Sequence, residues 1–175
     1  MRPIFLSVVG RKGSGKSQVI ENLISFLKER GYRIGLIKHL AKAGMEIDQP
    51  GKDTYRYRQC GAQTVVLSGQ TRLAVFSEIA EETPLEKLWL FFEGYDLVLL
   101  EGYFLESILK IEVHRGELGD PLTQKMENVL AIVSDVVMAS SAVHFTYGQI
   151  SILASLVEDR IKNGADIISP KEIHA

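Results

Sequence analysis

Apolar runs alternate with amphipathic stretches along most of the chain. Residues 4–9 are almost entirely apolar, which is typical of a strand buried on both faces of a sheet. Apolar residues within 16–30 recur at helical spacing, and Gly31 follows them as a helix stop. The same patterns predict strands over residues 32–38, 96–101, 110–114 and 129–133, and helices over residues 53–60, 84–92 and 147–163. This order predicts a three-layer α/β fold with a mostly parallel central sheet.

Two segments add to this pattern. Residues 63–67 and 72–76 are short runs on either side of Ser68-Gly69-Gln70, which predicts a strand hairpin extending from the domain. Within the helix predicted over 84–92, the stretch Leu-Trp-Leu-Phe-Phe at 88–92 is apolar all round. Such a stretch either packs under the sheet or forms a contact with a second copy of the chain.

The composition is that of an ordinary globular protein. The chain has 175 residues, 46% of them apolar and 24% charged, and we expect a single domain over residues 1–175. The net charge of -2 gives no overall field for nucleic acid or an anionic membrane surface, and no apolar run reaches the roughly 20 residues of a membrane span. The single cysteine, Cys60, excludes an internal disulfide, predicts a cytoplasmic protein and is expected to be a small buried hydrophobe.

A phosphate-binding motif follows the first predicted strand. It reads Gly10-Arg11-Lys12-Gly13-Ser14-Gly15-Lys16-Ser17, which matches G-x-x-x-x-G-K-[ST] at every fixed position. Glycines let backbone N–H groups turn inward toward phosphate oxygens, and the N-terminus of the next helix adds its positive dipole. In this motif the lysine reaches the β and γ phosphates, and the final hydroxyl, here Ser17, binds Mg²⁺. The fold is therefore expected to be P-loop NTPase-like.

A second acidic residue for the metal is expected at the end of a neighbouring strand. Glu101 ends the buried run 96–101, and ligands of open α/β sheets bind beyond the carboxyl ends of strands. The polar stretch after the second strand should reach the same edge. In it, Asp48 or Asp53 could approach the metal and Lys52 the γ-phosphate, while an ordinary solvated loop is the alternative.

The guanine signature N-K-x-D is absent from the sequence, so base recognition has to come from elsewhere, and Asp135 is the candidate. This residue follows the buried run 129–133, and its carboxylate could accept the N1–H and N2 amino hydrogens of guanine. The alternative is that Asp135 caps the turn over residues 136–141.

Several segments occur in an order that resembles a known family. They are the P-loop, Ile37-Lys38-His39, Asp48-Gln49-Pro50-Gly51-Lys52-Asp53-Thr54, Gly61-Ala62, Leu100-Glu101-Gly102-Tyr103 and Lys110-Ile111-Glu112-Val113-His114-Arg115. This resembles MobB, the family of molybdopterin-guanine dinucleotide biosynthesis adaptor proteins, over about residues 3–135.

The resemblance implies a GTP-binding protein that works beside the guanylyltransferase joining GMP to molybdopterin. It implies a homodimer with a hairpin at the contact, and weak GTP hydrolysis at most. By the same resemblance, residues 10–17 would hold the phosphates, Glu101 would serve the metal, Asp48 and Lys52 would lie near the nucleotide, and Asp135 would lie near the base. Lys110 and Arg115 match the segment K-I-E-x-x-R, which carries no role derivable from the sequence.

Two other functions fit the motif less well. A small-molecule kinase using ATP could take its base and acceptor site from His39, Asp53 and Glu101, but the sequence shows no arginine-rich lid. A nucleotide-dependent metal-insertion chaperone would normally carry a cluster of His or Cys, whereas this chain has four scattered histidines and one cysteine.

Overall fold

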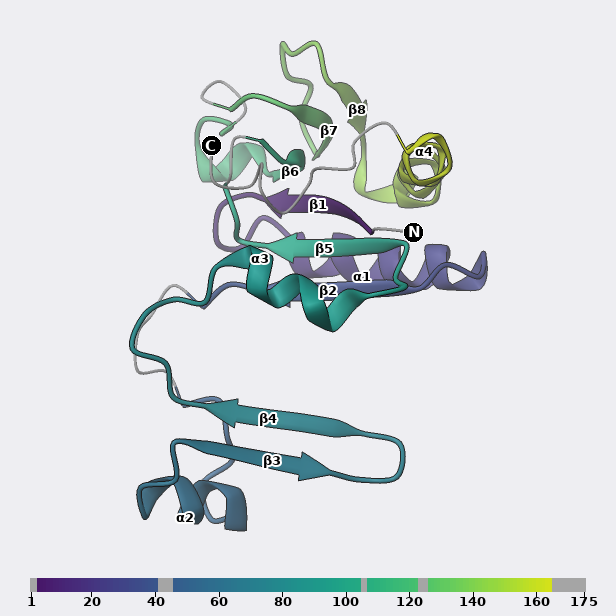
Figure 1. Cartoon of the computed structure of the whole chain (residues 1–175). Coiled ribbons are helices and arrows are strands. Elements are labelled where there is room, and N and C mark those ends of the chain that lie inside the picture. The colour runs from purple at the N-terminus through teal and green to yellow at the C-terminus, as the bar shows by residue number, and fades with distance from the viewer. Residues whose placement is uncertain (1–2, 41–45, 105–106, 123–125, 165–175) are drawn as a thin grey trace. The chain divides into compact units, whose positions relative to one another are not determined.

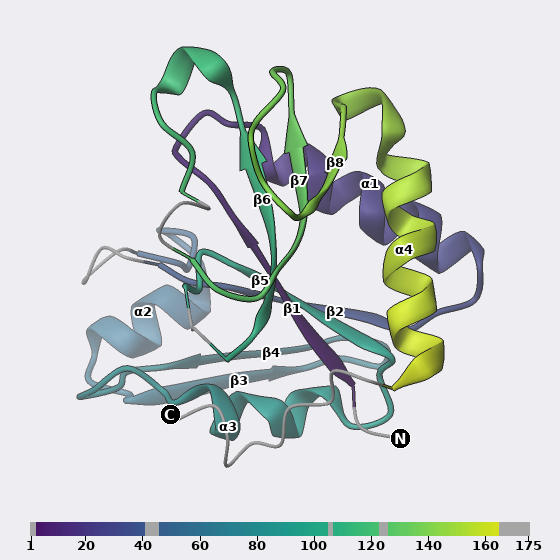
Figure 2. The ribbon, with the colours of Figure 1, turned by 90° about the horizontal axis from the view of Figure 1, so that it is seen from above.

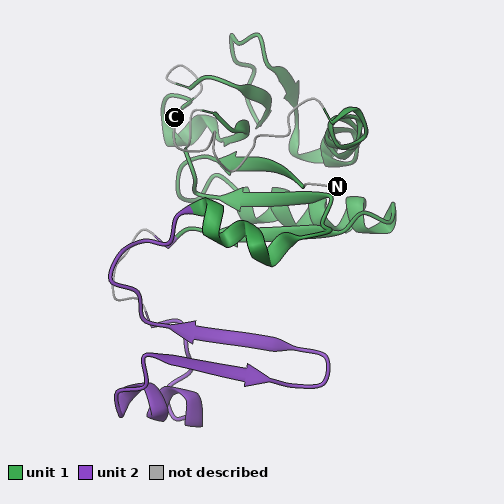
Figure 3. Ribbon diagram, in the orientation of Figure 1, with its two compact units in different colours: residues 1–39, 85–175 green, residues 40–84 purple. Residues whose placement is uncertain are grey.

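The computed structural model describes residues 3–40, 46–104, 107–122 and 126–164. Within this part, the chain divides into two compact units, residues 1–39 with 85–175, and residues 40–84 (Figure 3). Among the residues that the structure describes, none of the helices could span a membrane.

The first unit is built on a six-stranded sheet (Figure 1). Its strands are β2 (Ile34–Lys38), β5 (Leu97–Glu101), β1 (Ile4–Val9), β6 (Leu109–His114), β7 (Val129–Ser134) and β8 (Val143–Phe145), in that spatial order. Every neighbouring pair is parallel, so the carboxyl ends of all six strands meet at one edge. The predicted α/β fold class with a mostly parallel sheet is confirmed.

Helices cover both faces of this sheet because its central strands are apolar on both sides. On one face, α1 (Lys16–Glu29) and α4 (Ile150–Asn163) pack against Leu6 and Val8 of β1 and against each other (Figure 2). On the other face, α3 (Leu85–Leu88) and the 3-10 turn η1 (Trp89–Phe92) lie over Phe5, whose ring stacks on Trp89 with centroids 4.8 Å apart.

The second unit is small. It contains α2 (Asp53–Gln59) and a two-stranded antiparallel sheet of β3 (Thr64–Ser68) and β4 (Leu73–Ser77). The predicted hairpin is confirmed with each strand shifted by one residue. Cys60 is exposed, so the prediction of a buried thiol is wrong: it follows a short helix in which Thr54 is the buried residue.

Other differences from the predicted elements are local. The helix predicted over 84–92 is a four-residue α-helix followed by a 3-10 turn, and the one predicted over 147–163 begins with a 3-10 turn, η4 (Tyr147–Gln149). Strand β8 was not predicted, because three residues carry too little alternation to be recognised. Within the apolar stretch 88–92, Trp89 packs against the core, whereas Leu90 and Phe91 are exposed.

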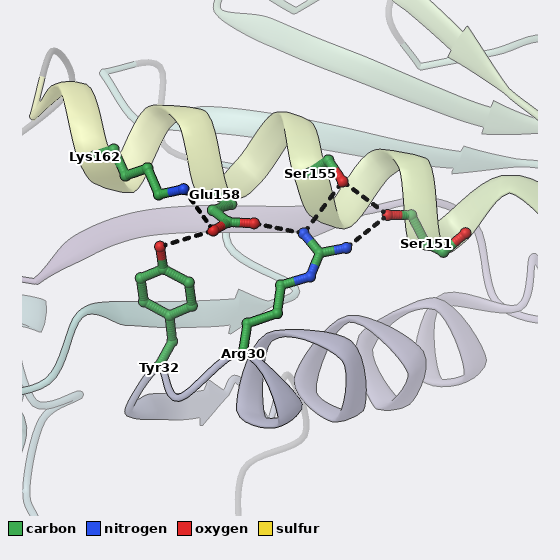
Figure 4. Close-up of polar contacts among 6 residues, drawn as sticks. All are labelled: Arg30, Tyr32, Ser151, Ser155, Glu158 and Lys162. Atoms are coloured by element: carbon green, nitrogen blue, oxygen red, sulfur yellow. Dashed lines mark hydrogen bonds and ion pairs between the residues drawn. The ribbon is translucent and has the colours of Figure 1, made fainter.

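A polar cluster joins α1 to α4 on the surface of the first unit (Figure 4). The Glu158 carboxylate lies 2.6 Å from Arg30 Nη1 and 2.7 Å from Lys162 Nζ, and it accepts a hydrogen bond from the Tyr32 hydroxyl at 3.1 Å. Arg30 also donates to the Ser155 hydroxyl and to the Ser151 carbonyl. These donors lower the pKa of Glu158 from its ordinary 4.5 to about 2, with Lys162 and Arg30 contributing most.

Candidate functional site

The loop between β1 and α1 is shaped by its glycines. Gly10, Gly13 and Gly15 have φ values of 152°, 85° and 92°, a region that residues with a side chain rarely adopt. At Gly10 an added Cβ would lie 2.2 Å from the carbonyl oxygen of Val113 on the neighbouring strand. The loop therefore passes so close to β6 that only glycine fits at its first position.

Lys16 is held inside this loop. Its Nζ donates to the carbonyl oxygens of Gly10 at 2.8 Å and Arg11 at 2.9 Å. An ammonium has three hydrogens, so one remains for an anion in front of the loop. Partial burial lowers the pKa of Lys16, and the negative charge of Glu101 acts in the opposite direction. The lysine is thus already in place where the loop would receive a phosphate.

The remaining side chains of the loop lie differently. The guanidinium of Arg11 turns to the carbonyl oxygen of Asp120, at 3.4 Å from Nε and 3.2 Å from Nη2. Lys12 and Ser17 are exposed, whereas Ser14 is buried, and its hydroxyl has no hydrogen-bond partner among the described residues. Arg11 is therefore engaged away from the loop's own interior.

Glu101 lies at the carboxyl end of β5, the strand next to β1. It is paired in register with Val8 on one side and with Lys38 on the other. Its Oε2 lies 3.2 Å from Lys38 Nζ, and only 15% of the Glu101 side chain is exposed. The structure thus brings Glu101 and Lys16 to the same edge, close enough for the carboxylate to act on the pKa of the lysine.

Asp135 lies on the opposite side of the loop, beyond β6 and at the end of β7. Its Oδ1 accepts the N–H of Gly116 at 2.9 Å, and its Oδ2 lies 3.9 Å from Nη1 of Arg115. Asp135 is exposed, with 41% of its side chain accessible. Its contacts bind it to the end of β6.

Arg115 and Tyr147 lie against the P-loop, although no role was predicted for either of them. The Tyr147 hydroxyl lies 2.5 Å from the carbonyl oxygen of Ser14 and 3.0 Å from that of His114. The guanidinium of Arg115 lies over the Tyr147 ring, 4.7 Å from its centroid. Burial raises the pKa of Tyr147. The sequence did contain one indication for Arg115, which is that it directly follows a strand of the central sheet.

Asp48 and Lys52 belong to the second unit. Asp48 Oδ1 accepts hydrogen bonds from the Thr54 hydroxyl at 3.2 Å and the Gln49 N–H at 2.8 Å, while Oδ2 lies 3.7 Å from Arg58 Nη1. Lys52 is exposed and precedes α2 as its N-cap residue. Asp48 thus ties the segment before α2 to the helix, and the roles of Asp48 and Lys52 toward a nucleotide stay predictions.

The fold and this site define the class of protein. A parallel sheet, a G-x-x-x-x-G-K-[ST] loop closed around its lysine, and an acidic residue at the end of the adjacent strand are the features of an α/β P-loop protein that binds nucleotides.

Comparisons with known proteins identify the family. The family model described as MobB, molybdopterin guanine dinucleotide synthesis protein B, matches residues 5–135. The chain is 33% identical to a molybdopterin-guanine dinucleotide biosynthesis adapter protein of Haemophilus influenzae, covering 88% of this chain and 87% of that one. It is 35% identical to the adapter protein of Escherichia coli, covering 75% and 78%. This chain therefore belongs to the MobB family of adapters in molybdopterin-guanine dinucleotide biosynthesis.

Solved structures have the same fold. The crystal structure of MobB from Bacillus subtilis superimposes with a TM-score of 0.73 at 22% identity, covering 90% of this chain and 97% of that one. A MobB protein homolog from Bacillus stearothermophilus gives a TM-score of 0.70 at 20% identity, covering 91% of this chain and 98% of that one.

Proposed function

We propose that this chain binds Mg-GTP at its P-loop and presents the nucleotide to the guanylyltransferase that joins GMP to molybdopterin. The observation that carries the proposal is the preformed loop, in which Lys16 is bound by two loop carbonyls and faces the Glu101 edge of the sheet. Membership of the MobB family supports the part of the proposal that concerns molybdopterin-guanine dinucleotide biosynthesis.

The residues present fit a magnesium ion. Mg²⁺ prefers hard oxygen ligands, and the exposed hydroxyl of Ser17 and the carboxylate of Glu101 are of that kind. We propose that these two hold the ion with the phosphates. Bound Mg²⁺ would neutralise phosphate charge, and Lys38 would leave its ion pair with Glu101 or share it.

We propose weak hydrolysis, because Arg11 points its guanidinium at Asp120 and no described residue is placed by its contacts to orient a water molecule at the loop. Turnover should stay below about one per second, the low end of ordinary enzyme rates. We also propose a cytoplasmic homodimer that uses the hairpin of β3 and β4.

The test is reconstitution. Purified chain would be added to the guanylyltransferase with molybdopterin and limiting GTP, and formation of the dinucleotide would be measured. The chain should raise product yield, and a Lys16→Ala variant should not. No stimulation by the intact chain would contradict the adapter role. A phosphorylated product from a metabolite panel with ATP would instead favour a small-molecule kinase.

A further inference from the structure

The topology places different side chains on the two sides of the P-loop, where a nucleotide base could lie once phosphates occupy the loop. The loop follows β1, the third strand in the sheet order. On one side of it, β5 and β2 end in Glu101 and Lys38, two charges that pair with each other. On the other side, the ends of β6, β7 and β8 lead into Arg115, Asp135 and Tyr147. The second side therefore offers a planar cation, a carboxylate and a ring.

Arg115 is the centre of this second group. Its Cζ lies over the Tyr147 ring, 4.7 Å from the ring centroid, and Asp135 Oδ2 lies 3.9 Å from its Nη1. Its Nη2 would lie 3.8 Å from a Cβ built on Gly15, so it stands beside the phosphate-binding loop. A third of the side chain, 34%, remains accessible. The residue is thus fixed on one side and open to a ligand.

Tyr147 links this group to the P-loop. Its hydroxyl contacts the carbonyl oxygens of Ser14 in the loop and His114 at the end of β6. The ring that supports Arg115 is therefore anchored to the segment that would hold the phosphates. Arg115, whose Nη2 would lie 3.8 Å from a Cβ on Gly15, therefore stands beside a nucleotide whose phosphates occupy the loop.

We propose that Arg115 is the stacking platform for the purine base, with Tyr147 as the positioning residue that holds the guanidinium in place and Asp135 at the edge of the base. Guanidinium groups stack on aromatic faces, and purine bases offer such a face. The inference rests on the proposed nucleotide function and adds a specific base-binding residue to it. A phosphate contact by Arg115 is the competing role, because of its distance from Gly15.

The experiment distinguishes a contact of Arg115 with the base from a contact with the phosphates. Each variant is titrated calorimetrically with GTP and with inorganic tripolyphosphate, both with Mg²⁺. Arg115→Ala should weaken GTP binding roughly 5- to 150-fold, the range for one stacking contact, and change tripolyphosphate binding less than twofold. Arg115→Lys should weaken GTP binding as well, because it keeps the charge but loses the plane. This second variant tests the proposal even if Arg115→Ala fails to fold.

Arg33→Ala is the matched control, because Arg33 also lies over a tyrosine ring, 4.8 Å from the centroid of Tyr95, before the start of β2. It should bind both probes as the unaltered chain does. Equal loss of both probes in Arg115→Ala, recovery of GTP binding in Arg115→Lys, or unchanged GTP binding in both variants would each overturn the stacking role. Failure of the unaltered chain to bind GTP would instead reject the proposed function, and the inference with it.

Discussion

At the scale of single residues, the P-loop requires glycine for two different physical reasons, which are a positive φ and the close approach of a neighbouring backbone. Gly10 and Gly13 both have positive φ, but only Gly10 has a backbone atom in the place of its missing side chain. The motif was readable from the sequence, because its spacing is fixed. The close approach of Val113 was not, because it depends on how β6 lies beside β1.

Gly10→Ala should therefore destabilise the fold more than Gly13→Ala. The first change adds a clash with the Val113 carbonyl to backbone strain, and we expect a loss of about 3 kcal/mol or more. The second adds strain alone, at about 1–2 kcal/mol, with open space around the new methyl group. Urea denaturation of both variants measures this, and equal losses would contradict the packing argument.

The contacts of Arg115 and Tyr147 could not be predicted for a related reason. Ser14 and Tyr147 are 133 positions apart, and their contact arises only when β8 takes its place at the edge of the sheet. Glu101 was predictable, because the end of a long apolar run is visible in the sequence and the rule for ligand edges is general.

At the scale of elements, α1 and α4 are joined by polar contacts as well as by their apolar faces. Strong amphipathic periodicity made both helices predictable, but the Glu158 cluster between them joins positions more than 120 residues apart. Because its pKa is lowered in the folded state, Glu158 stabilises the fold above about pH 4.5. That contribution is lost as the pH falls toward about 2.

Glu158→Gln should lower the urea midpoint at pH 7, and the difference from the unaltered chain should shrink as the pH approaches 3. The glutamine keeps the size of the side chain but removes the charge that faces Arg30 and Lys162. Asp159→Asn, at an exposed neighbouring position, is the control and should change little at either pH. A difference that is independent of pH would show that the ion pairs do not set this stability.

At the scale of the whole molecule, the small unit leaves one face of its hairpin open. Val66 and Val75 pair directly across the two strands, are 55% and 45% exposed, and have the exposed Leu73 near them on the same face. The opposite face carries Phe76, over which Arg58 of α2 lies. The two short runs on either side of Ser68-Gly69-Gln70 predicted the hairpin, but not which of its faces α2 would cover.

If the homodimer we propose uses this open face, Val75→Lys should give a monomer that remains folded. A charge placed in a buried apolar contact is costly, whereas the same charge on an exposed strand of the monomer is not. Sedimentation equilibrium measures the state, and Ile152→Lys on α4, at 56% exposure, is the control that should stay dimeric. A Val75→Lys dimer would exclude this face from the contact.

The central claim is that residues 10–17 form a guanine nucleotide site in a MobB-family chain. Calorimetric titration with GTP and with ATP, each with Mg²⁺, on the unaltered chain and on Lys16→Ala tests it most directly. We predict that GTP binds clearly more tightly than ATP and that binding is lost in the variant, because the two loop carbonyls that Lys16 binds leave one of its three ammonium hydrogens for a phosphate. Preference for ATP, or GTP binding that survives the loss of Lys16, would contradict the account.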